Sequence, residues 1–174
     1  MKIGVVGYGT VGAAVTRLFA SSRCHQIAIY DKFRQPYSRS SAKDDVNSCD
    51  LVFLCVPTPA AADGSCDLSA VEESAAWITA PLCIRSTVVP GTVERLSAAG
   101  VRPIVFSPEY LGESPGHPWN EDTACGFVIV GGPTPVAELV AAAYRTVAGP
   151  GVRFYFTSAR TAELCKYMEN LSWR

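Results

Sequence analysis

The sequence predicts an α/β fold of three layers, in which a doubly wound, mostly parallel sheet lies between two layers of helices. Short apolar runs alternate along the chain with segments whose apolar residues have helical spacing, and glycines or polar residues follow nearly every run. Strands that alternate with helices favour parallel pairing, with crossover helices on both faces. The 174 residues are enough for one such domain with a sizeable core.

The first element expected is a strand at residues 2–6, which leads through a glycine-rich turn into a helix. Gly7 permits a tight turn, Gly9 lets the backbone approach a pyrophosphate, and Gly12 lets the helix pack closely on the strand. The first N–H groups of that helix have no partners inside it, and with the helix dipole they favour a bound anion. The cofactor-binding residues expected here are Gly7, Gly9, Thr10, Val11 and Gly12.

A carboxylate follows the second expected strand. Residues 26–30 form an apolar run that ends in Asp31, about 20 residues past the glycines, where a carboxylate accepts hydrogen bonds from an adenosine ribose. The alternative is that Asp31 only caps a turn. A carboxylate also repels a ribose 2′-phosphate, which favours NAD over NADP, although Lys32 and Arg34 work against that preference.

Composition excludes several classes of function. The net charge is −1 without a basic stripe, so nucleic acid and anionic membranes are not expected partners. Neither a signal peptide nor a membrane span is expected. The seven cysteines form no CxxC pair and have no histidine at ligand spacing, which argues against a metal site and a disulfide framework and indicates a reducing, cytoplasmic compartment.

The later part of the chain continues the alternation. Residues 33–48 are polar and show no convincing helical stripe. Further strands are expected at residues 51–56, 82–85, 103–106, 126–132 and 152–156, and helices after Asp67 and at residues 93–98, 135–147 and 161–173. Ligands bind at the carboxyl ends of the strands in such a sheet. The strand exits singled out are residues 7–12, Asp31, 57–59, 86–87 and 107–109.

Five motifs in register resemble the nucleotide-sugar 6-dehydrogenases, a family that includes the UDP-glucose and GDP-mannose enzymes. They occur in the family's order and cover essentially the whole chain. The matching segments are residues 7–12, 55–69, 86–92, 107–113 and 161–170. The resemblance implies a Rossmann-like NAD domain and an enzyme that oxidises the sugar 6-hydroxyl to a carboxylate by two hydride transfers to NAD.

The same resemblance implies roles for individual residues. Thr87 looks like the hydroxyl that holds a catalytic water, Glu109 like a carboxylate that assists general-base steps, and Glu113 like a carboxylate near the nicotinamide. Lys166 and Asn170 look like a pair that stabilises oxyanions, and their spacing of four places both on one helix face. The further cofactor-binding residues implied are Lys32, Val56, Pro57, Thr58, Ser86, Thr87 and Glu113.

The sequence departs from the family in lacking the later glycine-rich segment with the nucleophilic cysteine. We therefore expect residues 1–160 to form the dinucleotide-binding domain and residues 161–174 to begin a truncated linking helix. Turnover of a nucleotide sugar would then need the missing half, and the macromolecular partners expected are a second copy of the chain or a partner protein. The alternatives are a free-standing NAD-binding or regulatory module and a small reductase of another NAD family.

Simpler interpretations remain open for the charged residues. Glu109 and Glu113 are also compatible with solvated carboxylates, and Lys166, with Glu163 and Glu169, is compatible with an exposed, salt-bridged helix face. His117, beside a proline in a loop, is more typical of a structural or exposed histidine than of a general base.

Overall fold

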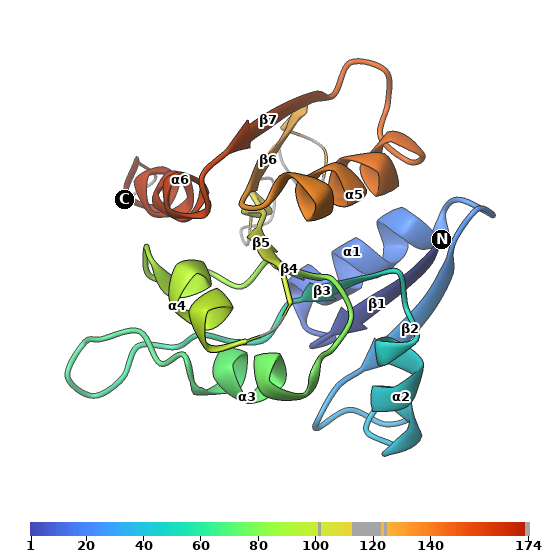
Figure 1. Cartoon of the computed structure of the whole chain (residues 1–174), viewed down its shortest axis with the longest axis horizontal. Helices are drawn as coiled ribbons and strands as arrows, with labels where there is room; N and C mark the ends of the chain where they lie inside the picture. Colours follow the sequence, from blue (N-terminus) through green and yellow to red (C-terminus); the bar gives the residue numbers. More distant parts are fainter. Residues whose placement is uncertain (101, 113–122, 124, 173–174) are drawn as a thin grey trace.

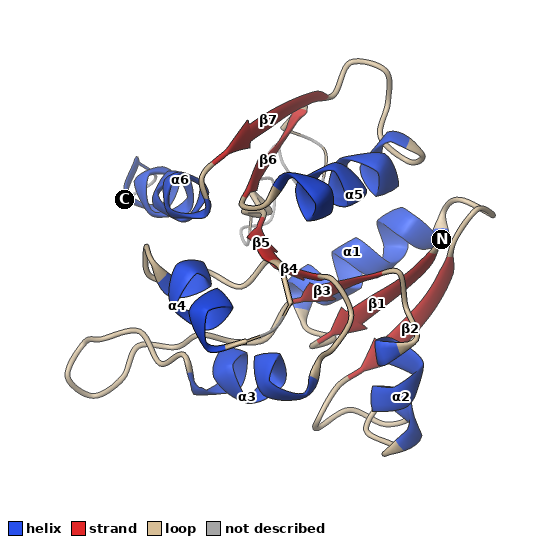
Figure 2. Ribbon diagram, in the orientation of Figure 1, coloured by secondary structure: helices blue, strands red, loops and turns tan. Residues whose placement is uncertain are grey.

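A computed structural model shows a seven-stranded sheet with helices on both faces (Figures 1 and 2), which confirms the predicted fold class. It describes residues 1–100, 102–112, 123 and 125–172. The spatial order of the strands is β2-β1-β3-β4-β5-β6-β7, and all neighbours are parallel except β5 and β6. The strands are β1 (Lys2–Val6), β2 (Gln26–Tyr30), β3 (Leu51–Leu54), β4 (Leu82–Ile84), β5 (Ile104–Phe106), β6 (Phe127–Gly131) and β7 (Arg153–Thr157).

In the described part of the chain, six helices divide between the two faces of the sheet (Figure 1). They are α1 (Thr10–Ala20), α2 (Ser41–Asn47), α3 (Ser69–Trp77), α4 (Thr92–Ala99), α5 (Thr134–Arg145) and α6 (Ala159–Ser172). Two separate apolar clusters follow from this arrangement. Side chains of α1 and α5 pack on one face, and side chains of α2, α3, α4 and α6 pack on the other.

The aromatic centre of the first cluster fixes α1 and α5 against the sheet. Phe19 of α1, Phe53 of β3 and Tyr144 of α5 are completely buried. The ring centroid of Phe19 lies 5.3 Å from that of Phe53 and 5.2 Å from that of Tyr144. Offset and edge-to-face contacts of this kind add to the free energy gained by burying the rings.

The sheet topology places a crevice beside the glycine-rich turn. From β1 the chain continues to β2 on one side, and it then crosses over to β3 on the other side of β1. Val6 at the end of β1 pairs in register with both Tyr30 and Leu54. The carboxyl ends of three strands therefore meet at the point where the strand order reverses, which is where ligands bind in open α/β sheets.

The segment at residues 33–48 contains a helix that the sequence pattern did not predict. In α2, Ala42 and Val46 are buried one turn apart, while the other helical positions are polar. Two apolar residues in seven are too few to produce a recognisable stripe. Contact with β1 and β2, rather than helix propensity, accounts for this helix.

Within the described residues, no helix is both long and apolar enough to cross a bilayer.

Candidate cofactor and active site

Two of the three glycines in the turn after β1 are required by the fold itself. Gly7 has a φ of +89°, and a Cβ there would lie 2.5 Å from the carbonyl oxygen of Cys55. A Cβ on Gly12 would lie 1.9 Å from the carbonyl oxygen of Gly7. These two positions let β1, β3 and α1 approach one another more closely than any side chain would allow.

Gly9 differs, because a Cβ there would meet no atom within 4 Å. It precedes α1 as the N-cap, and no side chain caps this helix. The N–H of Ala13 donates to the carbonyl of Gly9, so the N–H groups of Thr10, Val11 and Gly12 precede the first intrahelical bond. Open space and helix N–H donors therefore coincide at Gly9, an arrangement that fits a pyrophosphate group.

Asp31 is tied to both the glycine turn and its own turn. Its Oδ2 accepts a hydrogen bond from the Tyr8 N–H at 2.7 Å, and its Oδ1 accepts from the N–H groups of Phe33 and Arg34 at 2.9 Å each. Partial burial acts to raise the pKa of this carboxyl. The three backbone hydrogen bonds outweigh it, with help from the positive charge of Arg34, so the pKa lies below its ordinary value.

Asp31 therefore does cap its own turn, as the alternative interpretation expected. These hydrogen bonds do not use all the acceptor positions of its carboxylate. An ionised carboxyl has about four acceptor positions, and backbone donors occupy three of them. One acceptor position therefore remains without a backbone donor.

A pocket opens between this carboxylate and α3, and we call it the ribose pocket. It lies at the exits of β1 and β3, where Val56 and Pro57 line it opposite residues of α3. Lys32 and Glu73 also line it. Its full lining is Val6, Gly7, Tyr30, Asp31, Lys32, Phe33, Val56, Pro57, Ala70, Glu73, Ser74 and Trp77.

Side-chain hydrogen bonds join the exits of β3 and β4. The Thr58 hydroxyl donates to the carbonyl of Thr87 at 2.7 Å, and the Ser86 hydroxyl donates to the carbonyl of Val56 at 2.7 Å. The structure therefore brings together two sequence motifs, because Thr58 and Thr87 are 29 positions apart in the chain, and Val56 and Ser86 are 30 positions apart. These contacts fix the backbone of both exits, while the Thr87 side chain remains half-buried.

Lys166 lies in a buried ionic cluster at the exit of β5. Its Nζ is 3.1 Å from Oε1 of Glu109 and 3.2 Å from Oε2 of Glu169, and it lies 5.6 Å from the centre of the Tyr110 ring. The Lys166 side chain is only 7% exposed. Glu163, one turn earlier on α6, is fully buried. The interpretation of Lys166, Glu163 and Glu169 as an exposed, salt-bridged face is therefore wrong about exposure, because α6 turns Lys166 and Glu163 toward the protein, although the ion pair of Lys166 with Glu169 is present.

Residues 32–148 match the NAD-binding domain of the UDP-glucose/GDP-mannose dehydrogenase family. The chain belongs to this family. The matched segment starts just after Asp31, so the assignment does not depend on the glycine-rich turn.

Individual relatives are about twice as long as this chain. UDP-N-acetyl-D-mannosamine dehydrogenase of Pyrococcus horikoshii is 26% identical over 98% of this chain and 50% of its own length. The putative UDP-glucose 6-dehydrogenase YtcA of Bacillus subtilis is 28% identical over 98% and 48%. The structure of a UDP-glucose dehydrogenase from Pyrobaculum islandicum superposes with a TM-score of 0.78 and 24% identity, over 98% of this chain and 49% of that one. The chain thus spans about half the length of these relatives.

The remaining family positions divide into those the structure places and those it does not. Asn170 is exposed on α6, one turn beyond Lys166. Glu113 and His117 lie outside the described residues. Among the described residues, no group of three His, Cys, Asp or Glu side chains could hold a metal ion.

Of the two further carboxylates that contact proposed site residues, sequence reasoning found one and missed the other. Glu169 was expected to pair with Lys166, three positions earlier on the same helix, and the structure confirms this ion pair. Glu73 binds Lys32 from 41 positions away, and no local pattern announces such a contact.

Proposed function

We propose that this domain binds NAD in the crevice at the exits of β1 and β3, and that it forms the cofactor side of a nucleotide-sugar 6-dehydrogenase active site. The observation that carries the proposal is the environment of Gly9. This glycine is not required by packing, since a Cβ there would meet no atom within 4 Å, yet it stands directly before the first N–H groups of α1. A pyrophosphate in that space explains why the position is a glycine.

The other cofactor contacts follow from this placement. Asp31 would bind the adenosine ribose through its remaining acceptor position. Val56 and Pro57 would contact the adenosine from one side, and the α3 side chains from the other. Thr58, Ser86 and Thr87 line the exits farther along the sheet, where the nicotinamide half would extend.

The reaction proposed for the complete enzyme is oxidation of a sugar 6-hydroxyl, with NAD as the acceptor of hydride. Lys166 donates to oxygen atoms that become negative, and Glu109 and Glu169 hold its ammonium in place. An ammonium has three N–H donors, and two carboxylates leave one for a substrate oxygen. Glu109 would accept a proton, Thr87 would hold the water used in the hydrolytic step, and Asn170 and Glu113 would complete the site.

The half of the relatives that has no counterpart in this chain would supply the nucleophilic cysteine and the nucleotide-sugar pocket. We therefore expect the chain alone to bind NAD without oxidising UDP-glucose or GDP-mannose. The absorbance of NADH in mixtures of chain, NAD and either sugar nucleotide tests this expectation. Turnover by the chain alone would contradict the need for a second half.

Calorimetric titration with NAD tests the binding proposal. Gly9→Val should abolish binding while leaving the thermal unfolding midpoint unchanged, because its side chain enters open space. Gly149→Val is the matched control, since Gly149 also has no atom near its Cβ position but lies in the turn before β7. Absence of NAD binding by the wild-type chain, or equal binding by Gly9→Val, would refute the proposal.

A further inference from the structure

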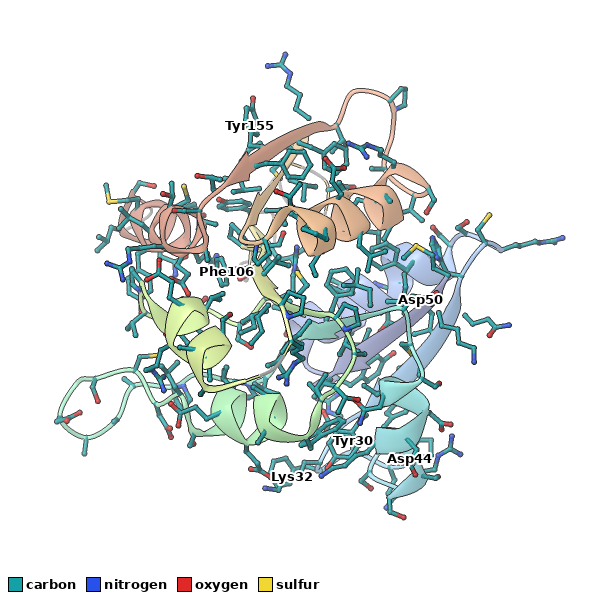
Figure 3. All side chains as sticks on the ribbon, in the orientation of Figure 1. Tyr30, Lys32, Asp44, Asp50, Phe106 and Tyr155 are labelled. Carbon is teal, nitrogen blue, oxygen red and sulfur yellow. The ribbon has the colours of Figure 1, made fainter. Side chains whose placement is uncertain are left out.

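An ion pair spans the ribose pocket. Lys32 follows β2, and Glu73 lies on α3 (Figure 3 shows Lys32 and Tyr30 beside this helix). The Nζ of Lys32 donates to Oε1 of Glu73 at 2.8 Å and to Oε2 at 2.9 Å. Both residues line the pocket that also contains Asp31. The cation nearest in sequence to the ribose-binding carboxylate is therefore already paired.

This pairing bears on the choice between NAD and NADP. The two cofactors differ by a phosphate on the adenosine ribose 2′-oxygen, and dinucleotide folds accommodate that phosphate with a nearby cation. Lys32 is in the right segment to do so. With Glu73 present, however, the pocket carries two carboxylates and one ammonium, so its local charge is negative.

Arg34 is the other cation in this segment. It is exposed, and its backbone N–H rather than its guanidinium donates to Asp31. The guanidinium of Arg34 affects Asp31 only through its charge, without a direct contact. Because the guanidinium is exposed to solvent, salt weakens this effect. Lys32 is thus the cation that would most directly affect binding of a 2′-phosphate if it were released from Glu73.

We infer that Glu73 is a cofactor-specificity residue, which holds Lys32 and adds a second negative charge, so that the pocket rejects a 2′-phosphate and selects NAD. The inference rests on the proposed binding of NAD in this pocket. Glu73 acts through Lys32 and through its own charge, and it is a positioning residue rather than a catalytic one. Its effect should appear in the ratio of NADP to NAD affinities and not in the stability of the fold.

The chain offers a matched control one residue away. Glu72 lies on the same helix, carries the same charge and is also paired, with Arg95 at 2.7 Å. Its side chain is 47% exposed, against 57% for Glu73, but it does not line the ribose pocket. Glu72→Gln and Glu73→Gln therefore change the net charge equally, but only Glu73→Gln releases Lys32 and removes a charge from the pocket.

The experiment is calorimetric titration of the purified chain with NAD and with NADP at low salt. Wild type should prefer NAD. Glu73→Gln should lower the NADP to NAD ratio of dissociation constants by about three- to tenfold, mainly by tightening NADP, as expected for one exposed charge at close range. Glu72→Gln should leave the ratio within about twofold, because Glu72 is paired with Arg95 rather than with Lys32 and does not line the pocket.

A second substitution tests whether Glu73 acts through Lys32. Adding Lys32→Gln to Glu73→Gln should restore the wild-type preference, since the released cation is then gone. Repeating the titrations at high salt should shrink the difference between wild type and Glu73→Gln.

The outcomes separate this inference from the proposed function. An NADP to NAD ratio that is the same in Glu73→Gln as in wild type, or that changes equally in Glu72→Gln, would overturn the inference while NAD binding stands. A wild-type chain that binds NADP as tightly as NAD would overturn it too. If the wild type bound neither cofactor, the proposed function would be refuted and this inference with it.

Discussion

Glu163 on α6 caps the start of α4 by accepting the N–H of Val93 at 2.8 Å. Its second carboxylate oxygen accepts the N–H of Gly91 at 2.5 Å, and both donors lie at least 70 residues away along the chain. No side chain within α4 caps this helix, and Gly91 precedes it in the left-handed region with a φ of +99°. A carboxylate is favourable at the positive end of a helix dipole. Glu163 thereby locks α6, which carries Lys166, onto α4.

Glu163→Gln should destabilise the fold. The amide NH₂ would replace one acceptor oxygen with a donor that faces a backbone N–H, and a buried donor left without a partner costs about 1–3 kcal/mol. Urea unfolding followed by circular dichroism measures the loss. Glu138→Gln is the control, because Glu138 forms an exposed pair with Arg145 at 3.5 Å, and we expect less than about 0.5 kcal/mol there. Equal losses in the two variants would contradict the capping role.

Asp31 should make stability depend on pH in the acidic range. Its pKa is lowered in the folded state, so the ionised carboxylate contributes stability that is fully present above about pH 5 and is lost as the pH falls through the folded-state pKa. Asp31→Asn removes the negative charge and replaces one of the two acceptor oxygens with an NH₂ donor, so at least one of the three backbone N–H groups loses its acceptor. The variant should be less stable than wild type at neutral pH.

The gap in unfolding free energy between wild type and Asp31→Asn should therefore shrink between about pH 5 and pH 3. Urea titrations at several pH values across this range measure it. A gap that stays constant, or that grows on acidification, would mean that the three hydrogen bonds do not favour the ionised form.

Gly12→Ala should lower the stability of the fold, whereas Gly9→Ala should lower only the affinity for NAD. The added Cβ at Gly12 would lie 1.9 Å from a backbone oxygen of Gly7, so β1 and α1 must separate. We expect a loss of more than about 3 kcal/mol, or failure to fold, which places this change in the severe tail of single substitutions. At Gly9 the Cβ meets open space, so the fold should keep its stability and only NAD affinity should fall.

Thermal unfolding and NAD titration of the two purified variants separate these effects. If Gly9→Ala unfolded as readily as Gly12→Ala, Gly9 would be a structural glycine and the argument for a pyrophosphate there would fail.

The spacing of apolar residues, and the glycines and prolines between the apolar runs, were sufficient to predict most of the fold. The run before Gly7 and the helical spacing after Gly12 predicted β1 and α1, because local propensity and burial agree there. The missed helix α2 shows the limit of this approach. Its Ala42 and Val46 become a buried pair only after β1 and β2 provide a surface for them.

The site likewise contains features that the sequence could predict and features that it could not. Asp31 could be proposed from its distance to the glycines, because both belong to one strand, turn and helix unit. The burial of Glu163 and Lys166 could not be predicted from the sequence. A helix with charges at these spacings has the same sequence pattern whether it faces solvent or the rest of the protein. The pairing of Lys32 with Glu73 depends on where α3 packs, which no spacing reveals.

The outer edge of β2 supplies the last prediction, because the sheet ends at this strand. The N–H of Gln26 donates to Met1, and the carbonyl of Tyr30 accepts from Gly7, so these residues face β1. Peptide groups alternate in direction along a strand, which turns those of Ile27 and Ile29 outward. The Rossmann order 3-2-1-4-5-6 has a further strand at this edge of the sheet.

Amide hydrogen exchange under native conditions should therefore alternate along β2. The N–H of Ala28, which faces β1, should exchange at least about tenfold more slowly than those of Ile27 and Ile29, which face solvent. Proline substitution gives an independent test. Ile29→Pro removes an outward N–H and should leave the protein folded, as prolines are tolerated on edge strands, whereas Ala28→Pro breaks the ladder with β1 and should unfold it. Slow exchange at Ile27 and Ile29 that strengthens with protein concentration would mean instead that a second chain pairs with this edge.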